Sequence, residues 1–347
     1  MRIGITGGSG SLGSALIRDI LNRERGTVVT LTRDEYKAQL MAERYGGAGG
    51  NVRIMLVADG LANQHRLAEV FRGCDVLIHA AALKRISESV YSSAEMLAVN
   101  AIGTQNLLAA ATEIGVKKVL IISSDKACAP INCYGATKYV AECLAIQHNA
   151  YSIPRGTAVA IARYGNVLGS RGSVVHLWRK QIEKKERLTV THGEMTRFLI
   201  TLERACDFIW DALNTMIGGE IYIPALSSAW MRDVAVAVAE NAGVEPRLSN
   251  DMGLRPGGEK LHEMLINGEE SLRTYRHNRG HPYDDRYTIV PSHRTWSDAP
   301  YDVGHPIVDE GGPQIIYSSD AAFGEHGKLS LDQLKWLLEH HVAQSWI

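Results

Sequence analysis

The chain has 347 residues, of which 45% are hydrophobic and 22% are charged, and its formal net charge is −1. This composition is typical of a globular protein with a substantial buried core. A balanced charge creates no long-range field for a nucleic acid or an anionic membrane, so we expect neither as a partner. No apolar run reaches the roughly 18 residues of a membrane span, and a strand pattern begins where a signal peptide would lie. We therefore expect a cytoplasmic protein.

The cysteines and histidines predict neither disulfides nor a metal site. The five cysteines are scattered and odd in number, which indicates reduced thiols: Cys74, Cys128, Cys133, Cys143 and Cys206. The 13 histidines show no metal-ligand spacing. His192 and His262 are therefore expected in loops or in the core, and we predict no metal.

The first half of the chain alternates short apolar runs with helical patterns. The runs predict strands at Arg2–Thr6, Thr27–Thr32, Asn51–Val57, Val76–Ala80 and Lys118–Ser123. Between them, apolar residues at helical spacing predict helices at Leu12–Asn22, Tyr36–Tyr45, Gln64–Phe71 and roughly Ser92–Ile114. This alternation predicts an α/β fold, a Rossmann-like doubly wound parallel sheet with helices on both faces. In such sheets ligands bind beyond the carboxyl ends of the strands.

After about residue 165 the alternation loosens. Further helices are predicted at Val174–Glu186, Leu202–Thr215 and Arg232–Asn241, and a sixth strand at Gly219–Pro224. The stretch Glu269–Gly312, rich in Arg, His, Asp, Pro and Tyr, predicts a loop-rich part of a smaller substrate-binding lobe, or alternatively a surface excursion. We therefore predict a dinucleotide-binding domain at 1–165 with returning segments at about 200–225, an interleaved lobe at 166–200 and 226–310, and a C-terminal tail at 311–347.

A glycine-rich turn joins the first strand to the first helix. Gly7, Gly10 and Gly13 have the spacing G-x-x-G-x-x-G. Glycines at these places permit a tight turn, close approach of the backbone to a pyrophosphate, and close packing of helix on strand. The helix N-terminus adds free N–H groups and the positive end of the helix dipole. A lone glycine triplet is usually an ordinary turn, but one between a strand and a helix predicts dinucleotide binding.

The end of the second strand bears on the choice of dinucleotide. It reads Thr32-Arg33-Asp34-Glu35. An arginine here accommodates the 2′-phosphate of NADP, whereas an acidic residue binds the ribose 2′-hydroxyl of NAD. Because Arg33 comes first we predict NADP, and Asp34 keeps NAD as the alternative.

The fifth strand leads into Ser123-Ser124-Asp125-Lys126, and Tyr134 and Lys138 follow on a helical pattern. Tyr-x-x-x-Lys places both side chains on one face of a helix. A lysine ammonium beside a phenol, together with an oxidised nicotinamide, lowers the pKa of the phenol, which can then take a proton from a substrate hydroxyl. On its own this pair is common on helix surfaces, but after a dinucleotide cradle it predicts an oxidising site.

Together these motifs resemble the extended short-chain dehydrogenase/reductase family. Within it, the chain closely resembles the inverting UDP-N-acetylglucosamine 4,6-dehydratases of pseudaminic acid and surface-polysaccharide biosynthesis. The resemblance covers nearly the whole chain and rests on the segments SSDKACAPINCYGATKYVAE, TRDEYK, RYGNVLGSRGSVV, MTRFLITLE, RPGGEKLHEMLI, YSSD and LSLDQL.

The resemblance implies a catalytic set of five residues. Asp125 and Lys126 match the acid/base pair of the family, and Tyr134 and Lys138 match its oxidising pair. Ser124 stands where the family usually has threonine, which keeps the hydroxyl group. In related 5-epimerases a methionine tends to replace the tyrosine, so Tyr134 favours a dehydratase.

A dehydration mechanism explains why these residue types are needed. Tyr134 deprotonates the C4 hydroxyl as hydride moves from C4 to the nicotinamide, and the ketone then acidifies the C5 proton. Lys126 removes that proton as a neutral amine, because desolvation beside other cations is expected to lower its pKa. Asp125, held protonated, donates to the departing C6 hydroxyl. Hydride returns to C6, and C5 receives a proton from the opposite face.

The resemblance also implies binding residues. Asp59 and Gly60 would face the adenine, or form a simple turn, and the alanines after the fourth strand would let the backbone lie along the cofactor. The predicted cofactor-binding set is Gly7, Ser9, Gly10, Ser11, Leu12, Gly13, Thr32, Arg33, Asp34, Glu35, Lys37, Asp59, Gly60, Ala80, Ala81, Ala82, Lys84, Asn100, Ser123, Tyr134, Lys138, Tyr164, Asn166 and Val167. The predicted UDP-sugar set is Lys84, Ser124, Tyr134, Asn166, Arg171, Thr191, Arg197, Arg255 and Glu259.

One departure from the family pattern and three alternatives remain. The family usually reads R-P-G-E, whereas this chain has an additional glycine between Arg255 and Glu259, which leaves the glutamate's role open. The rival enzyme is an NADP-dependent sugar-nucleotide epimerase or reductase on the same scaffold, and a non-catalytic NADP sensor is a more remote alternative. Lys84 could also be an ordinary surface lysine. The resemblance further suggests a homo-oligomer.

Overall fold

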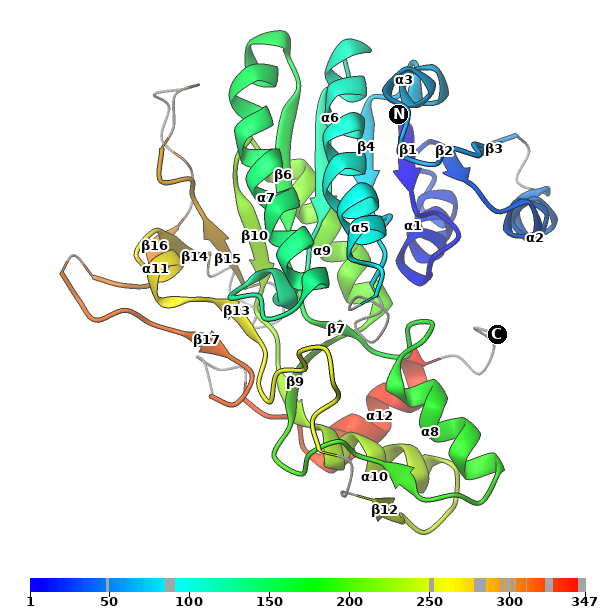
Figure 1. Cartoon of the computed structure of the whole chain (residues 1–347), viewed down its shortest axis with the longest axis vertical. Coiled ribbons are helices and arrows are strands. Elements are labelled where there is room, and N and C mark those ends of the chain that lie inside the picture. Colours follow the sequence, from blue (N-terminus) through cyan, green and yellow to red (C-terminus); the bar gives the residue numbers. More distant parts are fainter. Residues whose placement is uncertain are drawn as a thin grey trace.

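A ten-stranded sheet forms the centre of the larger part of the molecule (Figure 1). The computed structural model describes residues 1–47, 50–84, 91–249, 253–277, 285–293, 296, 301, 304–309, 311–321 and 327–342. The strand order is β16-β14-β15-β10-β6-β5-β4-β1-β2-β3. Its parallel part comprises β1 (Arg2–Thr6), β2 (Thr27–Thr32), β3 (Val52–Leu56), β4 (Val76–His79), β5 (Lys118–Ile122), β6 (Ala158–Ala162) and β10 (Ile221–Pro224).

Helices cover the sheet on both sides, so the predicted doubly wound α/β fold is confirmed. α3 (Gln64–Phe71), α6 (Gly103–Glu113) and α7 (Cys133–Ser152) pack in succession over one face. On the other face α1 (Ser11–Asn22) packs against α9 (Leu202–Thr215) (Figure 1). The first, second and fourth predicted helices of the first half begin within a residue or two of their expected positions. The fourth, however, is interrupted: α5 (Ser93–Met96) is followed by a π-helical turn at Leu97–Ile102 before α6.

Two parts of the sheet differ from the sequence-based expectation. β6 precedes the strand that we expected to be the sixth, and the sequence pattern did not predict it. Its sequence AVAIA has two branched residues, but the three alanines around them have low strand propensity, and burial on both faces removes any polar alternation. The stretch Glu269–Gly312 was expected to be a loop-rich part of the lobe. Its described residues instead form β14 (Thr274–His277), β15 (Arg286–Ile289) and β16 (His305–Pro306), which extend the central sheet antiparallel to one another.

Polar side chains made β14 and β15 hard to recognise, and the structure shows how they are accommodated. Arg286 is 3% exposed and donates to Thr215 at 2.8 Å and to the carboxylate of Asp211. Arg276 donates to Asp285 at 2.6 Å. The buried Arg286 and the half-buried Arg276 are therefore both paired with a carboxylate, which is the condition under which a strand can bury charge.

A second hydrophobic core lies below the sheet in Figure 1. It is built by α8 (Val174–Glu183), α10 (Met231–Asn241), α12 (Leu331–His341) and a small sheet of β7 (Asn166–Val167), β9 (Thr196–Ile200) and β11 (Ser228–Trp230). Leu334 and Leu338 of α12 pack into this core, so the end of the described chain belongs to it structurally. The domain boundaries drawn from the sequence remain a prediction.

Two pairs of short strands and the short helix α11 (Gly268–Ser271) lie outside these sheets. β8 (Leu188–Thr189) pairs with β12 (Leu248–Ser249), and β13 (Met264–Ile266) pairs antiparallel with β17 (Tyr317–Ser318).

All five cysteines are free thiols. Over the described ranges, no helix combines the length and apolarity needed to cross a bilayer, and no three side chains gather as metal ligands would.

The carboxyl end of β4 carries a buried histidine that links three elements. The Nδ1 atom of His79 lies 2.7 Å from Thr6 Oγ1 on β1, and its Nε2 atom lies 2.9 Å from Thr104 Oγ1 on α6. Burial, reinforced by the charge of Lys138, lowers the pKa of His79 to about 3. The imidazole therefore acts as a neutral cross-link.

We expect His79 to make the folded chain sensitive to acid. The unfolded chain takes up a proton near pH 6.5 and the folded chain only near pH 3, so this contribution to stability is present above pH 6.5 and is lost as the pH falls toward 3. His79→Gln keeps hydrogen-bonding atoms but does not titrate. Between pH 6.5 and about pH 4 its free energy of unfolding should therefore decrease less than that of the wild type, by up to about 3 kcal/mol. Denaturant titrations at each pH measure this, and parallel declines in both proteins would contradict it.

Candidate active site

The glycine-rich turn forms a tight cradle before α1. Gly7 has a positive φ of 74°, and a Cβ built there would lie 2.8 Å from the carbonyl carbon of Ala80. A Cβ on Gly13 would lie 2.3 Å from the carbonyl oxygen of Gly7. α1 begins without a side-chain cap, so its first N–H groups are available to an anion. These features fit a dinucleotide pyrophosphate.

The two candidate nucleotide-selecting residues after β2 have different surroundings. Asp34 caps α2 (Glu35–Tyr45): its carboxylate accepts the backbone N–H of Lys37 at 3.0 Å and lies 3.4 Å from the Lys37 ammonium. The backbone hydrogen bond lowers the pKa of Asp34. The exposed Arg33 extends beside Gly60, where a Cβ would be 3.8 Å from the Arg33 side chain. Asp34 is thus engaged in its own helix, whereas Arg33 lies over the turn after β3.

A small basic pocket adjoins the cradle. Its lining consists of Ser9, Ser14, Lys37, Leu40, Met41, Arg44 and Arg171. Arg171 reaches it from the loop after β7, where its backbone N–H donates to Ser11 Oγ at 2.9 Å, and Lys84 Nζ donates to the Arg171 carbonyl at 3.3 Å. The chain therefore brings Lys84, Arg171 and the cradle together, as an anionic ligand would need.

The segment after β4 is held in place by Asn100, which lies in the π-helical turn. Its side chain accepts the Leu83 N–H at 2.8 Å and donates to the Leu83 carbonyl at 2.9 Å and to Thr137 at 3.1 Å. Ala81 N–H donates to Thr6 Oγ1 at 3.2 Å. Asn100 therefore fixes the backbone predicted to lie along the cofactor.

Tyr134 and Lys138 occupy the first turns of α7, with Asn132 as the N-cap. Tyr134 is 8% exposed and forms a hydrogen bond with Ser124. Burial raises its pKa, and Asp125 adds to the rise while Lys126 opposes it. Among the protein's own groups desolvation outweighs the charge of Lys126, and a lowering of the Tyr134 pKa by Lys138 and an oxidised nicotinamide stays a prediction.

Lys138 is also buried, and its Nζ atom donates to the Ile122 carbonyl at 2.6 Å. Burial lowers its pKa to about 8, against the opposing charge of Glu142. The lysine therefore carries a proton that it can release near neutral pH.

A buried ion-pair network lies behind this helix. Arg163 is fully buried and donates to Glu142 at 2.6 Å, to Glu270 at 2.8 Å and to the Leu265 carbonyl at 2.8 Å. Ser123 Oγ donates to Glu142 at 2.5 Å. Ser123 thus joins β5 to α7 through this network, and its predicted contact with the cofactor stays a prediction.

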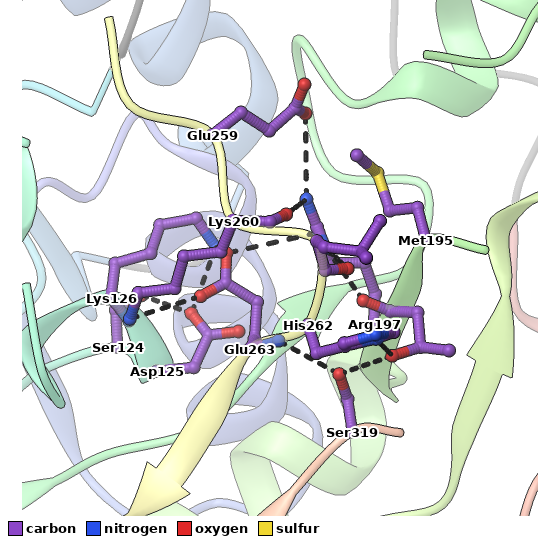
Figure 2. Close-up of polar contacts among 12 residues, drawn as sticks. Ser124, Asp125, Lys126, Met195, Arg197, Glu259, Lys260, His262, Glu263 and Ser319 are labelled. Carbon is purple, nitrogen blue, oxygen red and sulfur yellow. Dashed lines mark hydrogen bonds and ion pairs between the residues drawn. The ribbon is translucent and has the colours of Figure 1, made fainter. Parts of the chain in front are cut away.

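Asp125 and Lys126 follow β5 in a short 3-10 turn and form a buried charge cluster (Figure 2). Lys126 Nζ lies 3.0 Å from Asp125 Oδ1 and 3.1 Å from Glu263 Oε1. Ser124 Oγ donates to Asp125 at 2.8 Å. The second oxygen of Asp125 is buried without a hydrogen-bond partner among the described residues, so it is available to a substrate group.

The pKa values of this pair move in the same direction. Burial raises the pKa of Asp125, and Glu263 adds to the rise, although Lys126 opposes it. Burial lowers the pKa of Lys126, but the charges of Asp125 and Glu263 outweigh it and the net shift is upward. We expected neighbouring cations to make Lys126 a neutral amine. That is wrong, since two carboxylates contact it directly and Arg197 is farther away.

The predicted substrate residues Arg197 and Glu259 lie at the opposite side of this cluster (Figure 2). Arg197 is 5% exposed and donates to the backbone carbonyls of Thr196 at 2.7 Å, Lys260 at 2.9 Å and Leu261 at 3.1 Å. Its guanidinium lies 3.6 Å from Glu259. Arg197 thus organises the segment that carries Glu259 and Glu263.

The additional glycine does not separate Arg255 from Glu259. Arg255 Nε and N–H each donate to the Glu259 carboxylate at 3.0 Å. Gly257 and Gly258 have φ values of 97° and 95°, which favour glycine at both positions. The longer loop therefore folds back on itself, and the pair forms.

The structure also describes five further predicted binding residues. Thr191 contacts Met195 at 3.5 Å, Asn166 and Val167 form β7, Tyr164 is 5% exposed, and Asp59 is exposed after β3. The Asn166 Oδ1 atom is buried without a hydrogen-bond partner in the described part of the chain. Asn166 is therefore a further polar group available to a ligand.

Sequence reasoning missed Glu263 and Arg163. Glu263 lies within the quoted segment RPGGEKLHEMLI, but no regular spacing connects it to Lys126. Arg163 follows a strand that was itself not predicted. A basic residue at the end of a buried apolar run was the available signal for Arg163.

We expect the cradle to be intolerant of side chains. Gly13→Ala should weaken NADP binding at least tenfold, or about 1.4 kcal/mol, because its Cβ would overlap the Gly7 carbonyl oxygen. Gly47→Ala is the matched control, since a Cβ there meets nothing within 4 Å. Isothermal titration calorimetry measures both, and equal affinities in the two variants would exclude a cradle role.

Comparisons with known proteins agree with this geometry. The polysaccharide biosynthesis protein family matches residues 3–283. The chain is 37% identical over 323 residues to the inverting UDP-N-acetylglucosamine 4,6-dehydratase of Campylobacter jejuni, covering 91% of each protein. It is 31% identical over 339 residues to the UDP-glucose 4-epimerase of Rickettsia massiliae, covering 96% of this chain and 94% of that one. The X-ray structure of Pen from Bacillus thuringiensis superposes with a TM-score of 0.85 at 28% identity, covering 99% of this chain and 98% of that one.

Proposed function

Because this chain belongs to the polysaccharide biosynthesis protein family, we propose that it is a sugar-nucleotide 4,6-dehydratase. Its substrate is UDP-N-acetylglucosamine, and its product is the 4-keto-6-deoxy sugar with inverted C5. The observation that carries the proposal is the buried Asp125–Lys126 pair beside Tyr134. Removal of water requires one base and one acid close together, and this pair supplies both.

The pair can supply both groups without a change in its total charge. In the resting contact Lys126 is an ammonium and Asp125 a carboxylate, 3.0 Å apart. A substrate that closes over them removes water, which disfavours two separated charges relative to a neutral pair. One proton then passes from Nζ to Oδ1, which leaves an amine and a carboxylic acid. The raised pKa of Asp125 favours that transfer and the raised pKa of Lys126 opposes it, so the transfer depends on the removal of water by the substrate.

The residues then act in sequence. Tyr134 takes the proton of the C4 hydroxyl, with Lys138 as the nearby source of positive charge. A bound nicotinamide would supply the hydride acceptor for C4 and the hydride donor for C6, and a proton added to C5 from the face opposite Lys126 would complete the product. Lys126 takes the C5 proton, and Asp125 protonates the C6 oxygen, which leaves as water. The order depends on the ketone at C4, because only then is the C5 proton acidic.

The epimerase alternative uses Tyr134 and Lys138 but has no need of an acid that expels water. The protonatable Asp125 therefore favours the dehydratase, in agreement with the higher identity to the dehydratase relative. Mass spectrometry after incubation with UDP-N-acetylglucosamine separates the two. We expect a product lighter by one water, whereas an unchanged mass would indicate epimerisation and contradict the proposal.

Lys126→Ala should separate oxidation from elimination. The variant should bind NADP and still oxidise C4, because Tyr134 and Lys138 remain, but its dehydration rate should fall at least a hundredfold, as expected for loss of a general base. Absorbance of the reduced nicotinamide reports oxidation, and ¹H NMR in D₂O reports exchange at C5. Exchange at the wild-type rate would remove Lys126 from this role.

We also propose NADP as the cofactor. Asp34, the residue that would bind the ribose hydroxyls of NAD, is occupied as the cap of α2, while Arg33, Lys37 and Arg44 place positive charge near the cradle. The binding roles of the predicted cofactor and UDP-sugar residues, a homo-oligomeric assembly, a cytoplasmic location and a place in pseudaminic acid synthesis remain proposals from the sequence.

Arg33→Ala tests the cofactor choice. The variant should bind NADP about ten- to a hundredfold less tightly and NAD unchanged, because it loses a charge-assisted contact with the 2′-phosphate. Asp34→Asn is the control and should not improve NAD binding. Calorimetric titration with both dinucleotides measures the ratio, and a parallel loss of both in Arg33→Ala would contradict NADP selection.

A further inference from the structure

Glu263 is the second carboxylate on Lys126, and no step described above uses it. Its side chain is 3% exposed, with Oε1 3.1 Å from Lys126 Nζ and 4.0 Å from Arg197 Nε. The other oxygen, Oε2, has no hydrogen-bond partner among the described residues and lies 3.7 Å from Lys260 Nζ. Figure 2 shows the carboxylate between these cations. It is thus buried and surrounded by positive charge.

The backbone of Glu263 is held independently of Lys126. Its N–H donates to Ser319 Oγ at 2.9 Å, and the Ser319 N–H donates to the Glu263 carbonyl at 2.8 Å. His262 beside it lies 2.8 Å from Thr196 Oγ1 through Nδ1. Glu263 therefore approaches Lys126 from a fixed segment that leads into β13.

The pKa values of the two carboxylates that contact Lys126 are shifted in opposite directions. Burial raises the pKa of Glu263, but the charges of Lys126, Arg197 and Lys260 outweigh it, so its net pKa is lowered. The pKa of Asp125 is raised. Arg197 and Lys260 also remain in place, because both donate to backbone carbonyls, Lys260 to Cys128 at 2.7 Å. One carboxylate therefore accepts a proton, and the other stays ionised.

The charge of the cluster changes during the proposed reaction. Before elimination Asp125 is an acid and Lys126 an amine, so the pair is neutral. Once Lys126 has taken the C5 proton and before Asp125 has given its own to the C6 oxygen, both are protonated and the pair is a buried cation. An isolated buried cation is costly unless a counter-charge touches it.

We infer that Glu263 is the fixed counter-charge of this step: a positioning residue whose carboxylate holds Lys126 and stabilises it as an ammonium while Asp125 is still protonated. The inference rests on the proposed dehydratase function. Glu263 neither gains nor loses a proton, so the proton balance of the reaction is unchanged. A purely structural ion pair would instead contribute to folding without favouring one step of catalysis.

Glu263→Gln tests this, because the amide has nearly the same shape but no charge. We expect kcat to fall about ten- to a hundredfold with KM within about twofold. C4 oxidation, followed by absorbance of the reduced nicotinamide, should be retained while C5 exchange in D₂O slows. Glu220→Gln is the matched control: Glu220 is 1% exposed, accepts N–H groups of Ile217 and Gly218 and does not contact the cluster.

The pH profile provides a readout that a structural role would not move. Loss of the Glu263 charge weakens proton binding at both Lys126 and Asp125, so both limbs of the kcat profile should shift to lower pH. The other charged or titratable groups at the cluster include Arg197, Lys260, Glu259, His262 and Tyr134. Glu263→Asp, which keeps the charge, should restore the limbs and part of the rate. It also carries the test if Glu263→Gln unfolds below the assay temperature.

The outcomes separate this inference from the proposed function. If the wild type forms the dehydrated product and Glu263→Gln matches it in C5 exchange and in pH limbs, the inference is wrong and the function stands. If Glu263→Asp is as impaired as Glu263→Gln, the rate depends on the geometry of the Glu263 side chain and not on its charge. That result would also overturn the inference. If the wild type yields no dehydrated product, both proposals fail.

Discussion

The contact of one buried lysine with two carboxylates is the constraint on which the rest of the site depends. Lys126 is bonded to Asp125 at 3.0 Å and to Glu263 at 3.1 Å, with both carboxylates almost fully buried. Burial of three ionisable groups is tolerated only when each has partners of opposite charge in good geometry. The cluster therefore requires that distant segments of the chain be placed with an accuracy of a few tenths of an ångström.

The fold meets this requirement by joining two cores at the cluster. Asp125 and Lys126 follow β5 of the large sheet, and α7 brings Tyr134 to the same side. Arg197 on β9 comes from the sheet of the second core, and Glu263 directly precedes β13. The buried Arg163 network joins α7 to the segment just beyond β13 through Glu142 and Glu270. If the second core moved relative to the large sheet, the distances between Lys126 and the charged groups around it would change.

The sequence predicted those parts of the site that are local. The cradle, the Tyr134–Lys138 pair and Asp125–Lys126 each lie within one turn and its flanking elements. Spacing and context indicated the cradle and the Tyr134–Lys138 pair, and the family resemblance indicated Asp125–Lys126. Glu263 could not be found in this way, because its contact with Lys126 forms only when β13 packs against the 3-10 turn Asp125–Ala127. The direction of the Lys126 pKa was missed for the same reason. β6 was missed because alanine has low strand propensity, and β14 and β15 were missed because arginine and histidine interrupt their strand-forming residues.

The central claim is that Lys126 and Asp125 remove C5–H and the C6 hydroxyl after oxidation at C4. ¹H NMR of the product formed from UDP-N-acetylglucosamine in D₂O tests it most directly. The account predicts a 6-deoxy-4-keto sugar with one solvent deuterium at C5 and inverted configuration at that carbon. A product that keeps the original hydrogen and configuration at C5 would contradict it.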